Sequence, residues 1–87
     1  MSRAKKRLGQ HFLHDPGTIG RIVRAVAPRH GDRLVEIGPG RGAITAPLLE
    51  AAGALDVVEF DRDVLPALEA RCRGLGELRV HVHDALE

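Results

Sequence analysis

Three glycines alternate with other residues in the stretch LVEIGPGRG, residues 34–42. Gly38 and Gly40 are the first two, and glycines spaced this closely let a backbone pass close to a ligand. Two carboxylates accompany them: Glu36 precedes the first glycine, and Glu59 ends the next apolar run. This combination favours a site for a nucleotide-like cofactor.

Three classes of cofactor compete for this motif. A P-loop needs a lysine followed by Ser or Thr after its last glycine, but Gly42 is followed by Ala43, so we exclude it. Gly38, Gly40 and Ala43 match the dinucleotide fingerprint G-x-G-x-x-G/A. Glu59 follows about 20 residues later, where an acid binds the ribose. The NAD(P)-binding half-domain of an oxidoreductase therefore stays open.

The third cofactor is S-adenosylmethionine, whose methyltransferases share the strand, glycine turn, helix and acid-ended second strand. Glu36 favours it, because this carboxylate would repel a pyrophosphate but would attract the cationic amino and sulfonium groups. Glu59 can accept hydrogen bonds from both ribose hydroxyls. On these residues S-adenosylmethionine is preferred, and NAD(P) remains the alternative.

Apolar spacing and turn residues predict the elements that position these residues. Asp15 and Pro16 suit the start of an amphipathic helix, which Pro28 ends. We further predict strands at 33–37, 55–60 and 78–82 and helices at 43–52 and 61–73, the first of these regular only from near Thr45. This alternation predicts an α/β fold with a parallel sheet and right-handed crossovers.

The predicted sheet is incomplete, since a doubly wound domain normally has five or more strands. We therefore expect residues 15–87 to be the N-terminal half of a longer Rossmann-like domain, with only its first three strands. The first strand is expected to be buried. Six strand residues are expected to lack their final partners: Leu34, Val35, Val57, Val58, Leu78 and Val80.

Length and composition limit the class of protein. A chain of 87 residues holds one domain at most, and 44% hydrophobic with 29% charged residues is typical of a globular protein. Aromatic residues make up only 2%, so the core must be aliphatic. No apolar run is long enough for a membrane span, and the basic start lacks a signal peptide's apolar segment. The single Cys72 suits a reducing cytoplasm.

The net charge of +1 is unevenly distributed. Up to Arg33 there are eight Lys and Arg residues against two Asp, which gives +6; from Leu34 onward five Arg oppose ten Asp and Glu, which gives −5. Residues 1–14 hold a basic arm formed by Arg3, Lys5, Lys6 and Arg7. A basic leader on an acidic body predicts contact with a polyanion such as RNA.

Four runs together resemble a known family: LGQHFL at 8–13, EIGPGRGAIT at 36–45, VVEFDRD at 57–63 and HDAL at 83–86. They are similar, in order and spacing, to the KsgA/RsmA-type rRNA adenine N6,N6-dimethyltransferases. The resemblance implies a class I methyltransferase fold, a Rossmann-like parallel sheet with helices on both faces. The QHFL block makes it specific, because other class I methyltransferases usually lack this block. Erm-type 23S rRNA methylases are relatives and remain an alternative.

The resemblance also implies roles for individual residues. His11 stands where the family more often has Asn, and it contacts S-adenosylmethionine together with Leu13. The backbones of Gly38 and Gly40 approach the methionine moiety of this cofactor, and Glu59 holds its ribose.

At the end of the chain, Asp84 resembles the acid that accepts the exocyclic amine of adenine, with the Ala85 N–H beside it. Eight cofactor-binding residues are therefore predicted: His11, Leu13, Glu36, Gly38, Gly40, Glu59, Asp84 and Ala85.

The family's substrate is rRNA of the small ribosomal subunit, methylated on the N6 amines of two adjacent adenosines during ribosome biogenesis. Its catalytic Asn-Leu-Pro-Tyr-type motif follows a fourth strand, and this chain has no Tyr. We therefore expect the catalytic residues to lie beyond Glu87, no methyl transfer by this chain alone, and a monomer.

Two further expectations concern metals and a non-enzymatic alternative. His81 and His83 lie two residues apart, but no third ligand accompanies them, so we expect no metal site. The remaining hypothesis is a non-catalytic RNA-binding module, in which the basic arm matters and the pocket is vestigial.

Overall fold

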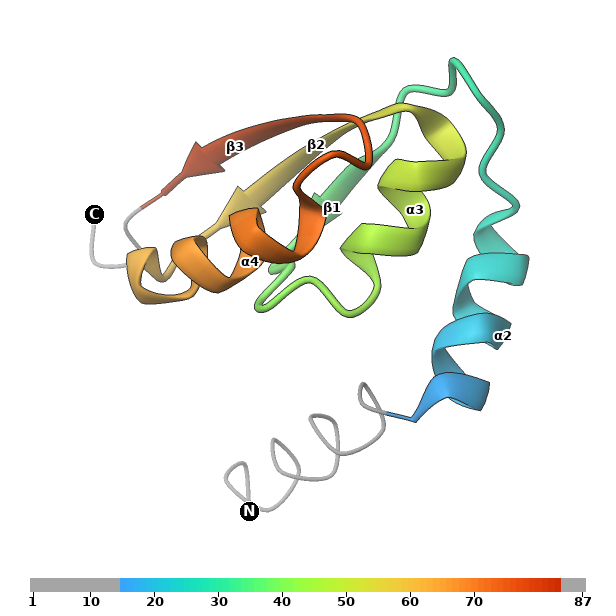
Figure 1. The fold of residues 1–87 in the computed structure, drawn as a ribbon, viewed down its shortest axis with the longest axis horizontal. Coiled ribbons are helices and arrows are strands. Elements are labelled where there is room, and N and C mark those ends of the chain that lie inside the picture. Colours follow the sequence, from blue (N-terminus) through green and yellow to red (C-terminus); the bar gives the residue numbers. More distant parts are fainter. Residues whose placement is uncertain (1–14, 84–87) are drawn as a thin grey trace.

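The computed structural model describes residues 15–83 (Figure 1). Its elements are, in chain order, α2 (Pro16–Val26), β1 (Val35–Ile37), α3 (Thr45–Ala52), β2 (Ala54–Glu59), the 3-10 turn η1 (Arg62–Val64), α4 (Leu65–Cys72) and β3 (Glu77–Val82). The predicted alternation of strands and helices is confirmed, and α3 begins at Thr45 as expected. None of the helices described in this range is long and apolar enough to cross a membrane.

The three strands form one parallel sheet in the order β1-β2-β3. In this register Ile37 is level with Val58, and Glu59 is level with Val82. Because parallel strands point the same way, the turn after β1 and the acid at the end of β2 come to the same edge of the sheet. This edge is where open α/β sheets bind their ligands.

The helix α2 begins and ends as its sequence predicts. The carboxylate of Asp15 accepts hydrogen bonds from the backbone N–H groups of Gly17 and Thr18, each at 3.3 Å, and from the Thr18 hydroxyl at 2.7 Å. These bonds satisfy N–H groups that the first helical turn leaves free. The helix ends at Ala27, which directly precedes Pro28 and has a left-handed backbone conformation with a φ of 52°.

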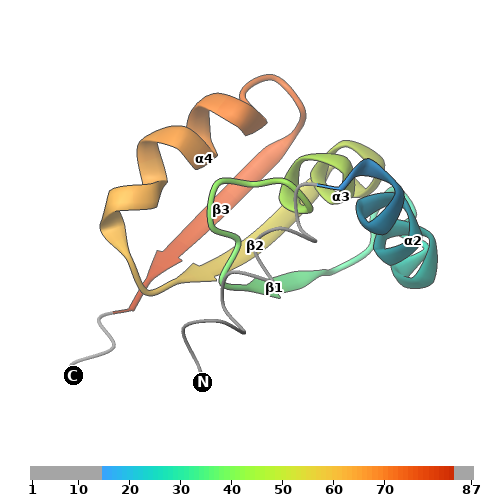
Figure 2. The same cartoon turned by 90° about the horizontal axis from the view of Figure 1, so that it is seen from below.

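Both α3 and α4 cover the same face of the sheet (Figure 2). Alternate residues of β2 point towards α3 and α4, so Leu55 and Val57 are fully buried. The core is aliphatic apart from one thiol, as predicted: Leu48, Leu49, Leu55, Val57, Leu68 and Cys72. The expectation that Val57 awaits further partners is wrong, because α3 and α4 already bury it.

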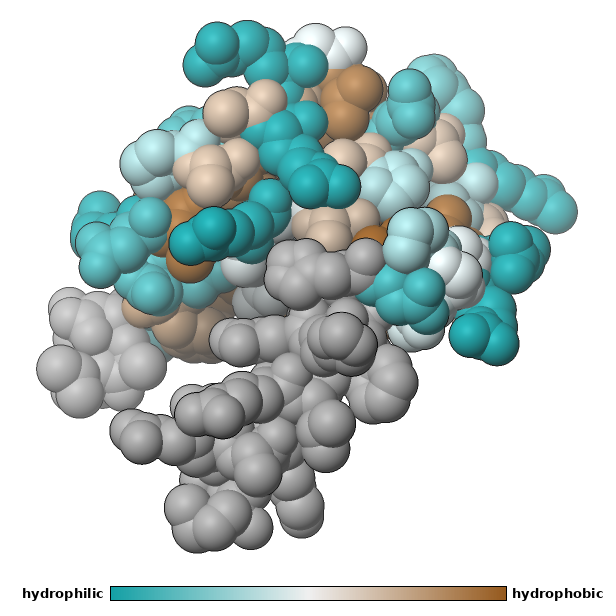
Figure 3. Space-filling view, turned by 60° about the horizontal axis from the view of Figure 1, so that its bottom comes forward, coloured by the Kyte–Doolittle hydropathy of each residue, from teal (hydrophilic) through white to brown (hydrophobic). Residues whose placement is uncertain are grey.

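The opposite face of the sheet is open within residues 15–83, where no helix covers it. Val35 and Ile37 are 65% and 64% exposed, so the prediction of a buried first strand is wrong. The physical reason is that Val35 and Ile37, unlike Glu36 between them, point to the face of the sheet away from α3 and α4. For Val35 this exposure agrees with the expectation that it lacks its final partners. Figure 3 shows the molecule with the bottom of the Figure 1 view turned forward, and on this side hydrophobic residues reach the surface between hydrophilic ones.

The segment predicted as one helix at 61–73 is divided. Asp61 accepts a hydrogen bond from the Asp63 N–H at 2.9 Å and caps η1, and α4 starts only at Leu65. A helix running from Asp61 would place Pro66 in its interior, where proline removes a hydrogen bond and clashes with the preceding turn. Starting at Leu65 puts Pro66 in the first turn, where no intrahelical N–H bond is lost.

Candidate functional site

The turn between β1 and α3 has an open side formed by two glycines. Gly38 and Gly40 have φ values of +69° and +57°, which disfavour residues with a side chain. A Cβ placed on either glycine would have no atom of the described residues 15–83 within 4 Å. The Gly38 N–H donates to the Val58 carbonyl at 2.8 Å and anchors the turn to β2. This part of the turn is therefore held in place and can be approached closely by a ligand.

The third glycine of the motif serves packing instead. Gly42 is buried, has a φ of +92°, and would place a Cβ only 3.0 Å from Leu68 Cδ1 of α4. No side chain fits at this contact without moving Leu68. The alternation of glycines thus combines two functions, an open surface at Gly38 and Gly40 and a helix contact at Gly42.

The Glu59 carboxylate joins two turns at the carboxyl edge of the sheet. The side chain is only 6% exposed. Its Oε1 accepts from the Gly40 N–H at 3.1 Å, and its Oε2 accepts from the N–H groups of Phe60 and Asp61, each at 2.9 Å. A carboxylate offers about four acceptor positions, so one position on Oε1 remains for a further donor.

A second carboxylate, Glu36, lies half-buried on β1. Its Oε1 accepts a hydrogen bond from the hydroxyl of the fully buried Thr45 at 2.6 Å. Burial raises the pKa of Glu36 above its ordinary value of 4.5, and the nearby charge of Glu59 raises it further, against the opposing effect of the Thr45 hydrogen bond. Two acids near each other in a partly buried site favour a cationic ligand over an anionic one.

Thr45, Phe60 and His83 also belong to this region, although none of them is among the residues predicted for the site. Phe60 follows Glu59 directly and is 43% exposed, and its ring meets the His83 ring edge-on with centroids 5.8 Å apart. An aromatic residue directly after the strand-ending acid is a local signal in a chain with only two Phe. Thr45 gives no such signal, because its partner Glu36 lies nine residues away.

An apolar hollow of about 320 Å³ lies beside the site, between α2, β1 and α3. Its lining includes Glu36 and these apolar residues: Ile22, Val26, Leu34, Val35, Ile37, Ile44, Leu48 and Leu55.

Four of the predicted cofactor residues come together at the carboxyl edge: Glu36, Gly38, Gly40 and Glu59. The others lie outside the described residues, as does the basic arm: His11, Leu13, Asp84, Ala85, Arg3, Lys5, Lys6 and Arg7. Within residues 15–83 no three side chains of His, Cys, Asp or Glu are grouped as metal ligands would be. His81 Nε2 instead lies 3.0 Å from Asp56 Oδ1.

The parallel sheet, the glycine turn and the acid-ended second strand define a Rossmann-like α/β fold. A solved dimethyladenosine transferase from Plasmodium falciparum superposes with a TM-score of 0.73 at 29% identity, over 84% of this chain and 27% of that chain. A putative RNA methyltransferase from Pyrococcus horikoshii has a TM-score of 0.62 at 19% identity, over 82% of this chain and 38% of that one, and shows the fold alone.

The sequence profile of the family described as "Ribosomal RNA adenine dimethylase" matches residues 1–87, and the chain belongs to that family. A protein called "Ribosomal RNA small subunit methyltransferase A" from Chromohalobacter salexigens is 53% identical over 98% of this chain and 30% of its own length. The same-named protein from Xanthomonas axonopodis pv. citri is 58% identical over 95% of this chain and 32% of its own length. The chain thus spans about a third of these relatives.

These comparisons confirm the KsgA/RsmA-type resemblance and the class of rRNA-modifying methyltransferase. They do not support the oxidoreductase half-domain or the Erm-type 23S rRNA methylase, since the relatives named above are small-subunit enzymes.

Proposed function

We propose that this chain forms the S-adenosylmethionine-binding part of a small-subunit rRNA adenine N6-dimethyltransferase that acts in ribosome biogenesis. One observation carries the proposal: the open glycine turn is hydrogen-bonded through Gly40 to the buried Glu59, with Glu36 close by. The names of the relatives support the substrate and the reaction.

The chemistry of the site fits S-adenosylmethionine better than a dinucleotide. The open side of Gly38 and Gly40 leaves space for the methionine moiety. Glu36 supplies negative charge for the amino and sulfonium groups, whereas a pyrophosphate would be repelled. The remaining acceptor position on Glu59 Oε1 takes one ribose hydroxyl, and a second hydroxyl would share or replace the Gly40 N–H.

The chain's own residues bind and orient the cofactor. When bound, S-adenosylmethionine supplies an activated methyl group, so the protein mainly has to position the groups that react. Phe60 offers an exposed aromatic ring next to Glu59, where the adenine can pack against it. We assign no catalytic residue to this chain.

The remaining assignments extend this proposal to residues outside the described range. His11, Leu13, Asp84 and Ala85 complete the cofactor site, and the basic arm within residues 1–14 contacts rRNA. Residues 15–87 act as the N-terminal half of the cofactor-binding domain, and the chain is a cytoplasmic monomer.

Isothermal titration calorimetry with S-adenosylhomocysteine and with NAD tests the cofactor assignment. We expect saturable binding of S-adenosylhomocysteine and no heat with NAD. Binding of NAD alone would contradict the proposal. A radiolabelled methyl-transfer assay on immature small subunits complements it, and we expect no turnover by this chain by itself.

A further inference from the structure

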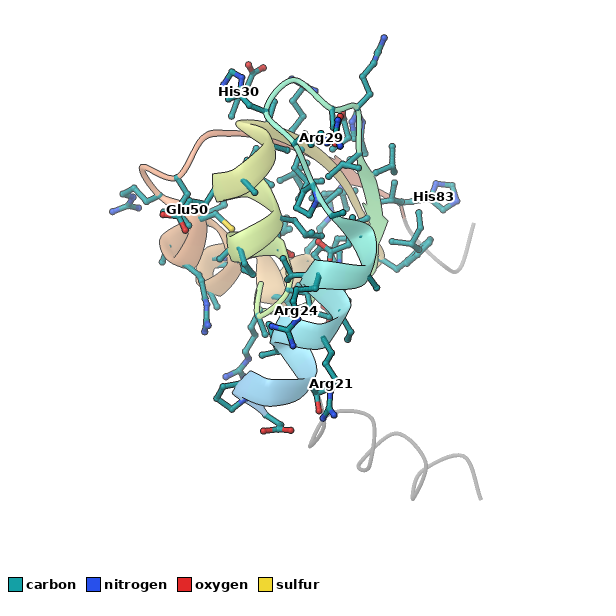
Figure 4. All side chains as sticks on the ribbon, turned by 90° about the vertical axis from the view of Figure 1, so that its right-hand side faces the viewer. Arg21, Arg24, Arg29, His30, Glu50 and His83 are labelled. Carbon is teal, nitrogen blue, oxygen red and sulfur yellow. The ribbon has the colours of Figure 1, made fainter. Side chains whose placement is uncertain are left out.

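An exposed basic surface lies on the side of the molecule formed by α2 and the loop after it. Arg21 and Arg24 stand on successive turns of α2, and Arg29 lies in the loop, and all three are exposed. Figure 4 labels Arg21 and Arg24 along α2 and Arg29 in the loop above the helix, all on the side of the molecule that faces the viewer. We call these three residues the α2 arginine surface.

These arginines form no salt bridge with another described residue, although the charge of Arg21 acts on Asp15 and Arg24 packs over Gly20. The salt bridges in residues 15–83 join Arg79 and His81 to Asp56 and Arg79 to Glu77, and none involves the α2 arginine surface. The acids of the same segment serve the backbone: Asp15 caps α2, and Asp32 Oδ2 accepts from the Arg29 N–H at 2.7 Å. The three guanidinium groups therefore remain available to a ligand.

The helix also provides space for one of these side chains. Gly20 costs a helix interior about 1 kcal/mol relative to alanine. A Cβ on Gly20 would lie 3.3 Å from Arg24 Nη1, so the guanidinium lies over the helix where a side chain would otherwise stand. The Arg24 guanidinium therefore lies along the surface of α2 over Gly20, and the residue is exposed.

We propose that the α2 arginine surface binds the phosphate backbone of RNA, which rests on the rRNA substrate of the proposed function. Arginine matches phosphate oxygens through paired N–H donors. The apolar side of α2 is turned inward, since Ile22 lines the hollow beside β1 and Val23 packs against the core. A helix in that orientation cannot insert its apolar side into a membrane interface, so electrostatic binding to a nucleic acid is the better match.

The salt dependence of binding to a labelled single-stranded RNA, measured by fluorescence anisotropy, tests this proposal. The variant Arg21→Gln/Arg24→Gln/Arg29→Gln keeps good helix formers on α2. Each lost phosphate contact on a single strand reduces the steepness of log affinity against log salt by about 0.7. We therefore expect the loss of three arginines to reduce this steepness by about 2. The matched control Arg62→Gln/Arg71→Gln/Arg73→Gln removes the same charge from exposed positions on the η1–α4 side and should leave the slope unchanged.

Further outcomes separate this inference from the cofactor proposal. The Arg21→Lys/Arg24→Lys/Arg29→Lys variant should keep the slope, because it keeps the charge. The glutamine variant should bind S-adenosylhomocysteine as the unaltered chain does. The inference would be overturned by an unchanged slope in the glutamine variant, by an equal fall of the slope in the control variant, or by no RNA binding by the unaltered chain. It would also be overturned if the glutamine variant lost binding only to phosphatidylserine vesicles and not to RNA. Failure to bind S-adenosylhomocysteine, with the RNA result intact, would instead overturn the cofactor proposal.

Discussion

Gly40 and Glu59 are linked directly: the Gly40 N–H donates to Glu59 Oε1 at 3.1 Å, although the residues are 19 positions apart. The bond joins the turn after β1 to the end of β2. It brings the open glycine surface and a buried acceptor into one site.

Replacing Glu59 by glutamine is expected to weaken both the fold and cofactor binding. Glutamine offers one acceptor oxygen and one NH₂ group, so at least one of the N–H groups of Gly40, Phe60 and Asp61 loses its partner. We expect the free energy of unfolding in urea to fall by about 1–3 kcal/mol. Glu50→Gln, on an exposed position of α3, is the control and should change it by less than about 0.5 kcal/mol. Equal stability of the two variants would contradict the structural role of Glu59.

Glu36→Gln is expected to separate stability from cofactor affinity. The raised pKa of Glu36 means that the folded chain holds this proton more tightly than the unfolded chain does. The free energy of unfolding therefore declines as the pH rises from 4.5 through the raised pKa, and the glutamine variant should lack this decline. Urea unfolding across this pH range measures the difference. A larger decline in the variant would show that the sign is wrong.

The same variant should discriminate between two related ligands. S-adenosylmethionine carries a sulfonium charge that S-adenosylhomocysteine lacks, so losing the Glu36 charge should weaken the first by about tenfold, or about 1.4 kcal/mol, and the second less. Thr45 can still donate its hydroxyl hydrogen bond to the glutamine oxygen, which keeps the local geometry. Calorimetric titration with both ligands checks this, and equal weakening would argue against a cation site at Glu36.

Substitution of the glycines should distinguish the ligand surface from the packing contact. Gly40→Ala places a methyl group in open space at a left-handed φ, which costs about 1–2 kcal/mol of stability and obstructs the ligand. Gly42→Ala also forces a clash with Leu68 and should cost about 1–3 kcal/mol more. Thermal unfolding and S-adenosylhomocysteine titration compare the two. If Gly40→Ala bound the ligand normally, the turn would not be the contact surface.

Cys72 provides a single probe of global unfolding, because it is the only cysteine and is 3% exposed. Burial raises the pKa of this thiol, and the charge of Glu36 raises it further, so little reactive thiolate forms in the folded chain. We expect alkylation at neutral pH to be slow in buffer and fast in urea, with a midpoint that matches unfolding followed by circular dichroism. Fast labelling without urea would show that α4 opens locally.

The sequence alone was sufficient for the order of the elements, the glycine motif and the family. The start of α2 at Asp15–Pro16, the start of α3 at Thr45 and the aliphatic core depend on caps, prolines and apolar spacing within a few residues. Such signals are local, so they can be recognised without knowing which strands are neighbours. The division of the segment before α4 was not predicted, although its causes, the Asp61 cap and Pro66 in the first turn, are local. The exposure of Val35 agrees with the expectation that it lacks its final partners, but the exposure of Ile37 was not predicted, because it depends on which face of the sheet the helices cover.

Only the tertiary structure determined how the predicted residues meet. The parallel register that sets Ile37 level with Val58 brings the turn after β1 to Glu59, and a shift by one residue would turn the Glu59 side chain to the other face of the sheet. The Gly40–Glu59 hydrogen bond follows from this register, and the edge-on contact of Phe60 with His83 follows from the pairing of β2 with β3 that sets Glu59 level with Val82. The Thr45–Glu36 hydrogen bond depends on how the glycine turn brings α3 back beside β1. Residue types therefore determined which chemistry is available, and strand pairing determined which groups share a site, because their distances depend on segments far apart in the chain.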